Sequence, residues 1–194
     1  MKPLAMREAS LADHRLTRRC FLQWGALAAA MSLCPRSALT STRGLQASER
    51  SLAFYNTHTG ESLSTVYWIH GEYLPEALAG VDYVLRDHRT DEVKPIDPQL
   101  LDLLHTIGKI LQSYRPFSII SGYRSPATNA YLRFFDGGVA EHSLHMDGKA
   151  VDIRLPGCAT IHLRRVAVAL RAGGVGYYRR SDFVHIDVGR IRYW

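Results

Sequence analysis

The chain has 194 residues, of which 46% are hydrophobic and 22% are charged. This length and composition are typical of a globular domain with its own core, and they exclude a disordered or low-complexity chain. The net charge of +6 suggests an acidic partner, but residues 1–40 alone hold six cationic side chains against two anionic ones. The rest of the chain is close to neutral, so its charge argues against a nucleic-acid-binding patch.

Residues 17–23, TRRCFLQ, resemble a twin-arginine export signal, with a small polar residue, Arg18 and Arg19, one free position and then Phe-Leu. The apolar run GALAAAMSLCP that follows is too short to cross a bilayer, which takes about 20 apolar residues. We therefore predict an export signal over residues 1–40, a polar linker over 41–50 and one domain over 51–194. The predicted location is the periplasm, and no membrane span is expected in the mature form.

The cysteines agree with this division of the chain. Cys20 and Cys34 lie in the export segment, which leaves Cys158 alone in the predicted domain and without a disulfide partner. The bulky Leu33 before Cys34 argues against a lipid anchor at that position. Cys158 is expected to be a packing residue, with a thiol nucleophile as the alternative.

In chain order, residues 51–70 are rich in β-forming residues and predict a hairpin that turns at Thr59-Gly60. A short helix is expected from Pro75, and its apolar residues recur at helical spacing. Residues 96–114 give the clearest helix, with Asp97 as its N-cap and an apolar stripe that extends to Tyr114.

The second half of the chain mixes strands and helices without regular alternation. A buried strand is expected at residues 116–121, a helix from Pro126 to Phe135, and a last helix from about Thr160 to Ala172. Short strands are expected at 149–154, 175–178 and 182–188. This order predicts an α+β fold, with a small central antiparallel sheet and helices packed on one of its faces.

Two of these strands carry polar side chains on one face. Side chains alternate along a strand, so Asp152 points away from its apolar neighbours, and His185 and Asp187 do the same on the last strand. Gly148 allows a tight turn that folds His145 back over the strand bearing Asp152. Two imidazoles and one carboxylate form the open three-ligand set of catalytic zinc sites, with water as the fourth ligand.

A second possible set of metal ligands has less support from the sequence. His142 and His145 are spaced as an i, i+3 pair, but they lie between glycines and have no carboxylate at helical spacing.

The chain also contains the ordered pattern S-G-Y-R-S, S-x-H-x-x-G-x-A-x-D and [DE]-x-x-H, at residues 121–125, 143–152 and 182–185. This pattern resembles the zinc D-Ala-D-Ala peptidases of bacterial cell walls, a group shared with lysostaphin and the hedgehog signalling domain. The segments NTHTGES, RAGGVGYY and FVHIDVG are similar to the murein endopeptidase K branch. The resemblance extends from about the linker to Trp194 and implies a fold like that of the hedgehog and D-Ala-D-Ala peptidase domains.

The resemblance also implies roles for individual residues. His145, Asp152 and His185 would hold one zinc ion per chain, and Asp182 would be the general base. Arg124 would stabilise the oxyanion or bind a substrate carboxylate. The substrate-binding residues would be Arg124, Ser143, Tyr123 and Tyr177; Tyr177 and Tyr178 could line a groove or only pack. Asp187 would orient His185 or form a structural salt bridge.

The implied function is zinc-dependent murein endopeptidase activity on the peptide cross-links of peptidoglycan. The alternatives are a D,D- or L,D-carboxypeptidase that trims stem peptides, and a non-catalytic zinc-containing module that binds peptidoglycan. Peptidoglycan is the expected partner, and the domain is expected to be a monomer.

Overall fold

The computed structural model describes residues 49–136 and 139–194, so the predicted export signal lies outside the described residues. The helices are α2 (Pro75–Val84), α3 (Pro98–Ile110), α4 (Pro126–Asp136), α5 (Thr160–Leu170) and the short 3₁₀ helix η2 (Leu144–Asp147). The strands are β1 (Glu49–Asn56), β2 (Ser62–Ile69), β3 (Glu72–Tyr73), β4 (Phe117–Ser121), β5 (Ala150–Arg154), β6 (Gly174–Tyr178), β7 (Phe183–Asp187) and β8 (Arg192–Tyr193).

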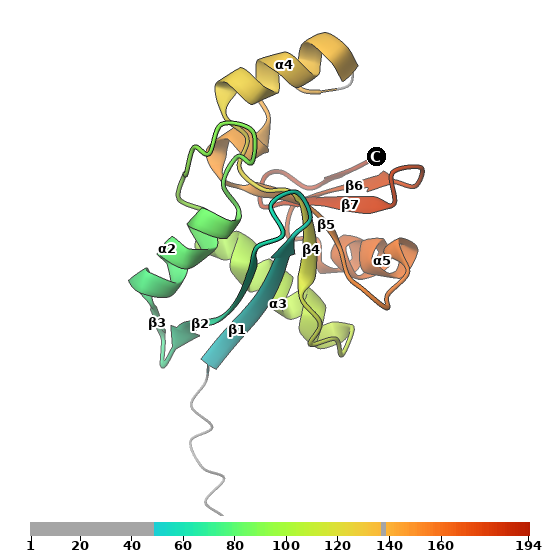
Figure 1. The fold of residues 1–194 in the computed structure, drawn as a ribbon. Helices are drawn as coiled ribbons and strands as arrows, with labels where there is room; N and C mark the ends of the chain where they lie inside the picture. Colours follow the sequence, from blue (N-terminus) through green and yellow to red (C-terminus); the bar gives the residue numbers. More distant parts are fainter. Residues whose placement is uncertain (1–48, 137–138) are drawn as a thin grey trace, which may run out of the picture. The chain divides into compact units, whose positions relative to one another are not determined.

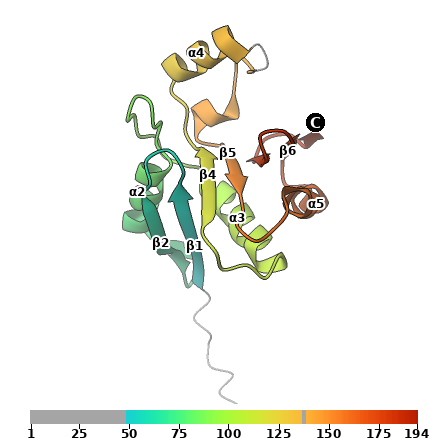
Figure 2. The same cartoon turned by 45° about the vertical axis from the view of Figure 1, so that its right-hand side comes forward.

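The strands form one eight-stranded sheet in the order β3-β2-β1-β4-β5-β7-β6-β8. Figures 1 and 2 show β2, β1, β4 and β5 side by side in the left part of this sheet. The predicted α+β class is confirmed, but the sheet is larger than expected and mixed. Strands β1 and β4 run parallel, as do β6 and β8. The β1–β4 pairing joins strands that are separated by two helices, so no local pattern predicts it.

The predicted N-terminal hairpin is confirmed. Strands β1 and β2 pair in antiparallel register from Tyr55↔Ser62 outward, and the turn contains Gly60 in the left-handed region at φ 75°. Strand β1 starts at Glu49, so the last two residues of the predicted linker belong to the domain.

The helices largely follow the sequence pattern. The Asp97 carboxylate accepts a hydrogen bond from the Gln99 amide at 2.9 Å and caps α3 as expected. The predicted extension of the apolar stripe to Tyr114 is wrong, because α3 ends at Ile110 and Tyr114 is 96% exposed. Helix α5 ends at Leu170, where Arg171 adopts the left-handed conformation that caps a helix.

The two faces of the sheet differ in character. Apolar side chains of β1, β4, β5 and β7 pack against α3 and α5 in one continuous core. The opposite face of β5 and β7 carries Asp152, His185 and Asp187 instead. Helix α4 lies beyond the ends of the strands in both views (Figures 1 and 2). Among the described residues, no helix is long and apolar enough to cross a membrane.

Candidate metal centre and groove

A tight turn brings His145 over strand β5, as the sequence predicts. Ser143 caps η2 by accepting a hydrogen bond from the His145 amide at 3.4 Å. Gly148 ends η2 in the left-handed conformation at φ 68°, and a Cβ at this position would collide with the carbonyl oxygen of Pro95. The turn therefore requires glycine on both conformational and steric grounds.

The sheet register places the other two members of the cluster side by side. Asp152 on β5 is directly opposite His185 on β7. His185 Nδ1 lies 2.9 Å from Asp152 Oδ1, and His145 Nε2 lies 3.1 Å from His185 Nδ1 and 3.4 Å from Asp152 Oδ2. His145, Asp152 and His185 are only 2%, 6% and 7% exposed, so the cluster is buried.

Hydrogen bonds on the outer side of each imidazole orient the rings. His145 Nδ1 is 2.8 Å from the carbonyl oxygen of Gly122, which can only accept, so Nδ1 carries the proton and the lone pair of Nε2 faces the cluster. His185 Nε2 lies 3.1 Å from Asp187 Oδ2, which turns its Nδ1 toward the cluster in the same way. The two inner nitrogens therefore converge on one point.

The charges in the cluster favour a cation at its centre. Burial opposes ionisation of Asp152, but His145 and His185 hold the pKa of its carboxyl below the ordinary value, so it is negatively charged. Burial also disfavours the charged form of His185, yet hydrogen bonds to Asp152 and Asp187 raise its pKa. A metal ion held by these ligands would neutralise the buried charge of Asp152.

The spacing of the three ligands fits a small metal ion. Nitrogen and oxygen ligands on a tetrahedral ion at ordinary bond lengths are about 3.3 Å apart, close to the separations found here. Among the described residues, His145, Asp152 and His185 are the one group of this kind, with their ligand atoms all within 4.8 Å of one another. The alternative set that includes His142 is not supported.

Asp187 supports the cluster from behind. Its fully buried carboxylate accepts hydrogen bonds from the amides of Gly174 and Gly189 at 2.9 and 2.8 Å, in addition to its contact with His185. Arg192 Nη2 lies 2.7 Å from the same carboxylate. Burial opposes its ionisation, while the hydrogen bonds from His185, Gly174 and Gly189 lower its pKa. Asp187 therefore both orients His185 and forms a salt bridge.

The cluster lies in the floor of an open groove of about 670 Å³. Arg124 and Ser143, both predicted to contact substrate, line it. The Arg124 guanidinium lies 3.7 Å from Asp152 Oδ2, 3.4 Å from Asn129 Oδ1 and 3.5 Å from Ser121 Oγ. Its Nη groups are therefore held beside the cluster, where they can donate to a bound substrate.

Two residues predicted to contact substrate do not line the groove in this structure. Tyr123 is 7% exposed, packs in the hydrophobic core and does not line the groove. Tyr177 pairs across the sheet with Val184, so its ring points to the apolar face, and Arg164 lies 5.7 Å above it.

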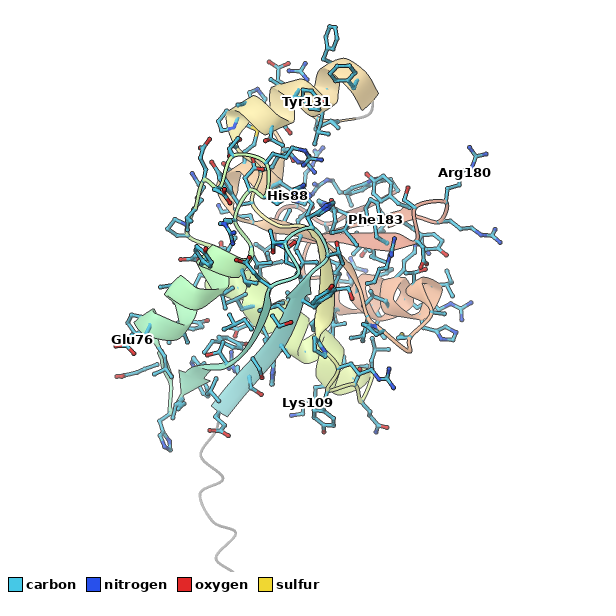
Figure 3. The ribbon with its side chains drawn as sticks, in the orientation of Figure 1. Glu76, His88, Lys109, Tyr131, Arg180 and Phe183 are labelled. Atoms are coloured by element: carbon cyan, nitrogen blue, oxygen red, sulfur yellow. The ribbon has the colours of Figure 1, made fainter. Side chains whose placement is uncertain are left out.

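The groove wall instead contains three aromatic residues: the sequence left open whether Tyr178 lines it, and it gave no role there to Phe183 or Trp194. Tyr178 pairs with Phe183, and both line the groove together with Trp194. Figure 3 shows Phe183 on β7, and Arg180 at the tip of the β6–β7 turn pointing away from the domain. Alternation along the strands would have identified Tyr178, since Tyr177 and Val184 share the apolar face. Trp194 had no such signal, because the pairing of β8 with β6 is not local in sequence.

The structure does not bring Asp182 to the cluster. Its side chain is 65% exposed and accepts a hydrogen bond from Thr160 Oγ1 at 2.8 Å. Arg154 Nε lies 3.8 Å from the same carboxylate, and Asp182 does not line the groove. The expectation that this carboxylate bends over the metal is not met in this arrangement, and its role as general base stays a prediction.

A buried His–Asp–His cluster that lines a groove in an α+β domain is a candidate metal site of the kind that metallopeptidases use. The chain belongs to the peptidoglycan L,D-endopeptidase MepK family, whose model matches residues 45–194. The match confirms the resemblance drawn from the sequence motifs, and it covers the whole predicted domain.

Individual relatives match over nearly the same length. The peptidoglycan L,D-endopeptidase MepK of Escherichia coli strain K12 is 40% identical over 177 residues, which cover 91% of this chain and 96% of the relative. The protein of the same name from Shigella flexneri matches equally well. The probable peptidoglycan L,D-endopeptidase MepK of Haemophilus influenzae is 38% identical over 178 residues, covering 91% of this chain and 95% of the relative.

Proposed function

We propose that this protein is a zinc-dependent peptidoglycan L,D-endopeptidase that hydrolyses peptide cross-links of the cell wall. One observation carries the proposal: His145, Asp152 and His185 direct three ligand atoms at a common point in the floor of an open groove. The relatives named for this activity support the choice of substrate, since they match over 91% of the chain.

Zinc is the metal that suits this ligand set best. Two imidazoles and one carboxylate are the ligands of many catalytic zinc sites, and they leave a coordination position for water or substrate. A bound zinc ion supplies Lewis acidity, which activates water and polarises the scissile carbonyl group.

The surrounding residues have separate tasks. The Gly122 carbonyl and the Asp187 carboxylate fix the rings of His145 and His185, so that their inner nitrogens carry lone pairs. Arg124 donates hydrogen bonds into the groove, either to the carbonyl oxygen under attack or to a carboxylate of the stem peptide.

The most direct test of the proposed function is chromatography of the muropeptides released from purified sacculi, with and without a chelator. We expect the protein to convert cross-linked dimers to monomers, chelator to abolish this reaction, and added zinc to restore it. Removal of terminal residues without loss of dimers would indicate a carboxypeptidase. Retention of sacculi without any soluble product would indicate a binding module.

We also propose export through the twin-arginine pathway to the periplasm, which the motif at residues 17–23 supports. Replacing Arg18 and Arg19 together by Lys keeps the charge but removes the guanidinium groups. The double variant should therefore leave precursor in the cytoplasm. Normal accumulation in the periplasm would point to the general secretory route instead.

A further inference from the structure

The aromatic wall of the groove contains a hydroxyl group that the functions assigned above do not use. Tyr178 is opposite Phe183 at the end of the β6–β7 pair, and their rings stack at 4.5 Å with an angle of 17°. Both side chains line the groove that holds the cluster. The stacking fixes the plane of the Tyr178 ring, and the hydroxyl at its tip therefore has little freedom to move.

Trp194 fixes the hydrogen-bonding role of this hydroxyl. The indole Nε1 lies 3.1 Å from the Tyr178 oxygen, and because an indole N–H can only donate, the tyrosine oxygen is the acceptor. The phenolic proton of Tyr178 is therefore left to donate to another group. No other partner for the hydroxyl occurs among the hydrogen bonds of the described residues.

The fold holds Trp194 close to the cluster. Its backbone pairs with β6, through Tyr177 N to Trp194 O at 2.9 Å and Trp194 N to Val175 O at 3.2 Å. Gly176 provides the space for the indole, since a Cβ there would lie 2.6 Å from the ring. The indole and the imidazole of His185 have centroids 5.2 Å apart. The donor that orients Tyr178 is thus packed directly against a metal-ligand candidate.

Arg124 faces the same space from a different element. Its Nη2 atom lies 3.7 Å from Oδ2 of Asp152, so the guanidinium also borders the metal-ligand candidates. Both line the groove, Arg124 from the loop before α4 and Tyr178 from β6. Arg124 and Tyr178 are therefore two hydrogen-bond donors in the groove that contains the cluster.

We propose that Tyr178 is a catalytic residue whose hydroxyl donates a hydrogen bond to the carbonyl oxygen of the scissile peptide bond, with Trp194 as its positioning residue. When the oxygen of water adds to the carbonyl carbon, the π electron pair of the C=O bond moves onto the carbonyl oxygen. The pair returns when the C–N bond breaks, and the amine leaves with a proton that came from the water. Tyr178 keeps its own proton throughout, and its hydrogen bond strengthens as the negative charge develops.

This inference rests on the proposed function, and Tyr178→Phe tests it without removing the stacked ring. Loss of one such donor typically lowers turnover by about 10²-fold, so we expect kcat on a cross-linked dimer to fall by that factor with KM nearly unchanged. Tyr55→Phe, at an exposed tyrosine of β1 far from the groove in sequence and sheet order, is the matched control and should keep the full rate.

A binding measurement separates this role from simple packing. A phosphinate analogue of the cross-link carries the tetrahedral geometry and negative charge of the reacting centre. Tyr178→Phe should weaken its binding by about the same factor as kcat, while binding of the product peptide and the metal content stay unchanged. Trp194→Phe keeps an aromatic ring but removes the N–H donor, and it should cause a smaller loss of kcat in the same direction.

The outcomes are distinct. If the unmodified protein releases no muropeptide from any cross-link, the proposed function fails and this inference fails with it. If the unmodified protein is active and Tyr178→Phe retains its kcat, or loses affinity for analogue and product equally, Tyr178 is only part of the groove wall.

Discussion

Strands β5 and β7 place opposite kinds of side chain on the two faces of one sheet. On one face, Val151, Ile153, Val184 and Ile186 are fully buried against the core under α3 and α5. On the other face, Asp152, His185 and Asp187 are almost as deeply buried, but each is held by hydrogen bonds and charge. Neighbouring residues in the same strand therefore contribute either to stability or to chemistry.

The difference has a physical consequence. Apolar burial stabilises the domain without any partner of fixed geometry, at about 25 cal/mol per Å². The polar face pays a desolvation cost that only correctly placed partners offset, and a metal ion would be the strongest of these. Substitutions on the two faces should therefore separate loss of folding from loss of function.

The largest effect on activity is expected from His185→Ala. Removing a metal ligand takes away several kcal/mol of transition-state stabilisation, so turnover should fall by roughly 10³-fold or more. Asp187 keeps its bonds to Gly174, Gly189 and Arg192, and the domain should still fold. Muropeptide release and circular dichroism would measure the two properties. A variant that unfolds would mean that the polar face also determines stability.

On the apolar face, Ile186→Ala should have the converse effect. Deleting a fully buried isoleucine side chain typically costs about 2–5 kcal/mol of stability through lost burial and the cavity left behind. Urea denaturation would measure this loss, and the folded fraction should keep the metal content of the unmodified protein. Loss of metal without loss of stability would contradict the separation of the faces.

A smaller effect is expected from Asp187→Asn. The amide keeps the size of the carboxylate but loses the charge that orients His185, and such changes typically lower metal affinity by about 10–100-fold. Competition with a chelator of known affinity would measure it. Asp147→Asn, at an exposed position of η2, is the control and should bind metal normally. Equal affinity in both variants would show that Asp187 has only a structural role.

Asp182→Asn tests the predicted general base, whose exposed carboxylate contacts Thr160 and Arg154 outside the groove. If the carboxylate keeps this position during the reaction, the rate should change by no more than about twofold, since substitutions at such sites usually change energies by about 0.5 kcal/mol or less. Initial rates on sacculi would test this. A fall of roughly 10²–10⁴-fold would instead identify Asp182 as the general base, and would require its loop to move into the groove when substrate binds.

The parts of the site that follow from local patterns could be predicted from the sequence. Alternation along residues 149–154 and 182–188 identified Asp152, His185 and Asp187, because side-chain direction in a strand depends only on position. The glycine at position 148 predicted the turn that returns His145, since its conformation requires a residue without a Cβ.

The parts that depend on distant pairing could not be predicted. Trp194 reaches the groove only because β8 pairs with β6. Asp182 accepts a hydrogen bond from Thr160 because the first residue of α5 lies close to it in the fold. Tyr177 and Tyr178 are neighbours on β6, so their side chains point to opposite faces of the sheet, Tyr177 to the core and Tyr178 to the groove. A motif identifies the residue types of a site, but the register decides which of two neighbours reaches it.

Elemental analysis of the purified protein tests the central claim, that His145, Asp152 and His185 form a zinc site, most directly. We predict about one zinc ion per chain in the unmodified protein and almost none when His145 and His185 are both replaced by Ala, with the double variant still folded. Full zinc content in the folded double variant would contradict the assignment of this cluster as the metal centre.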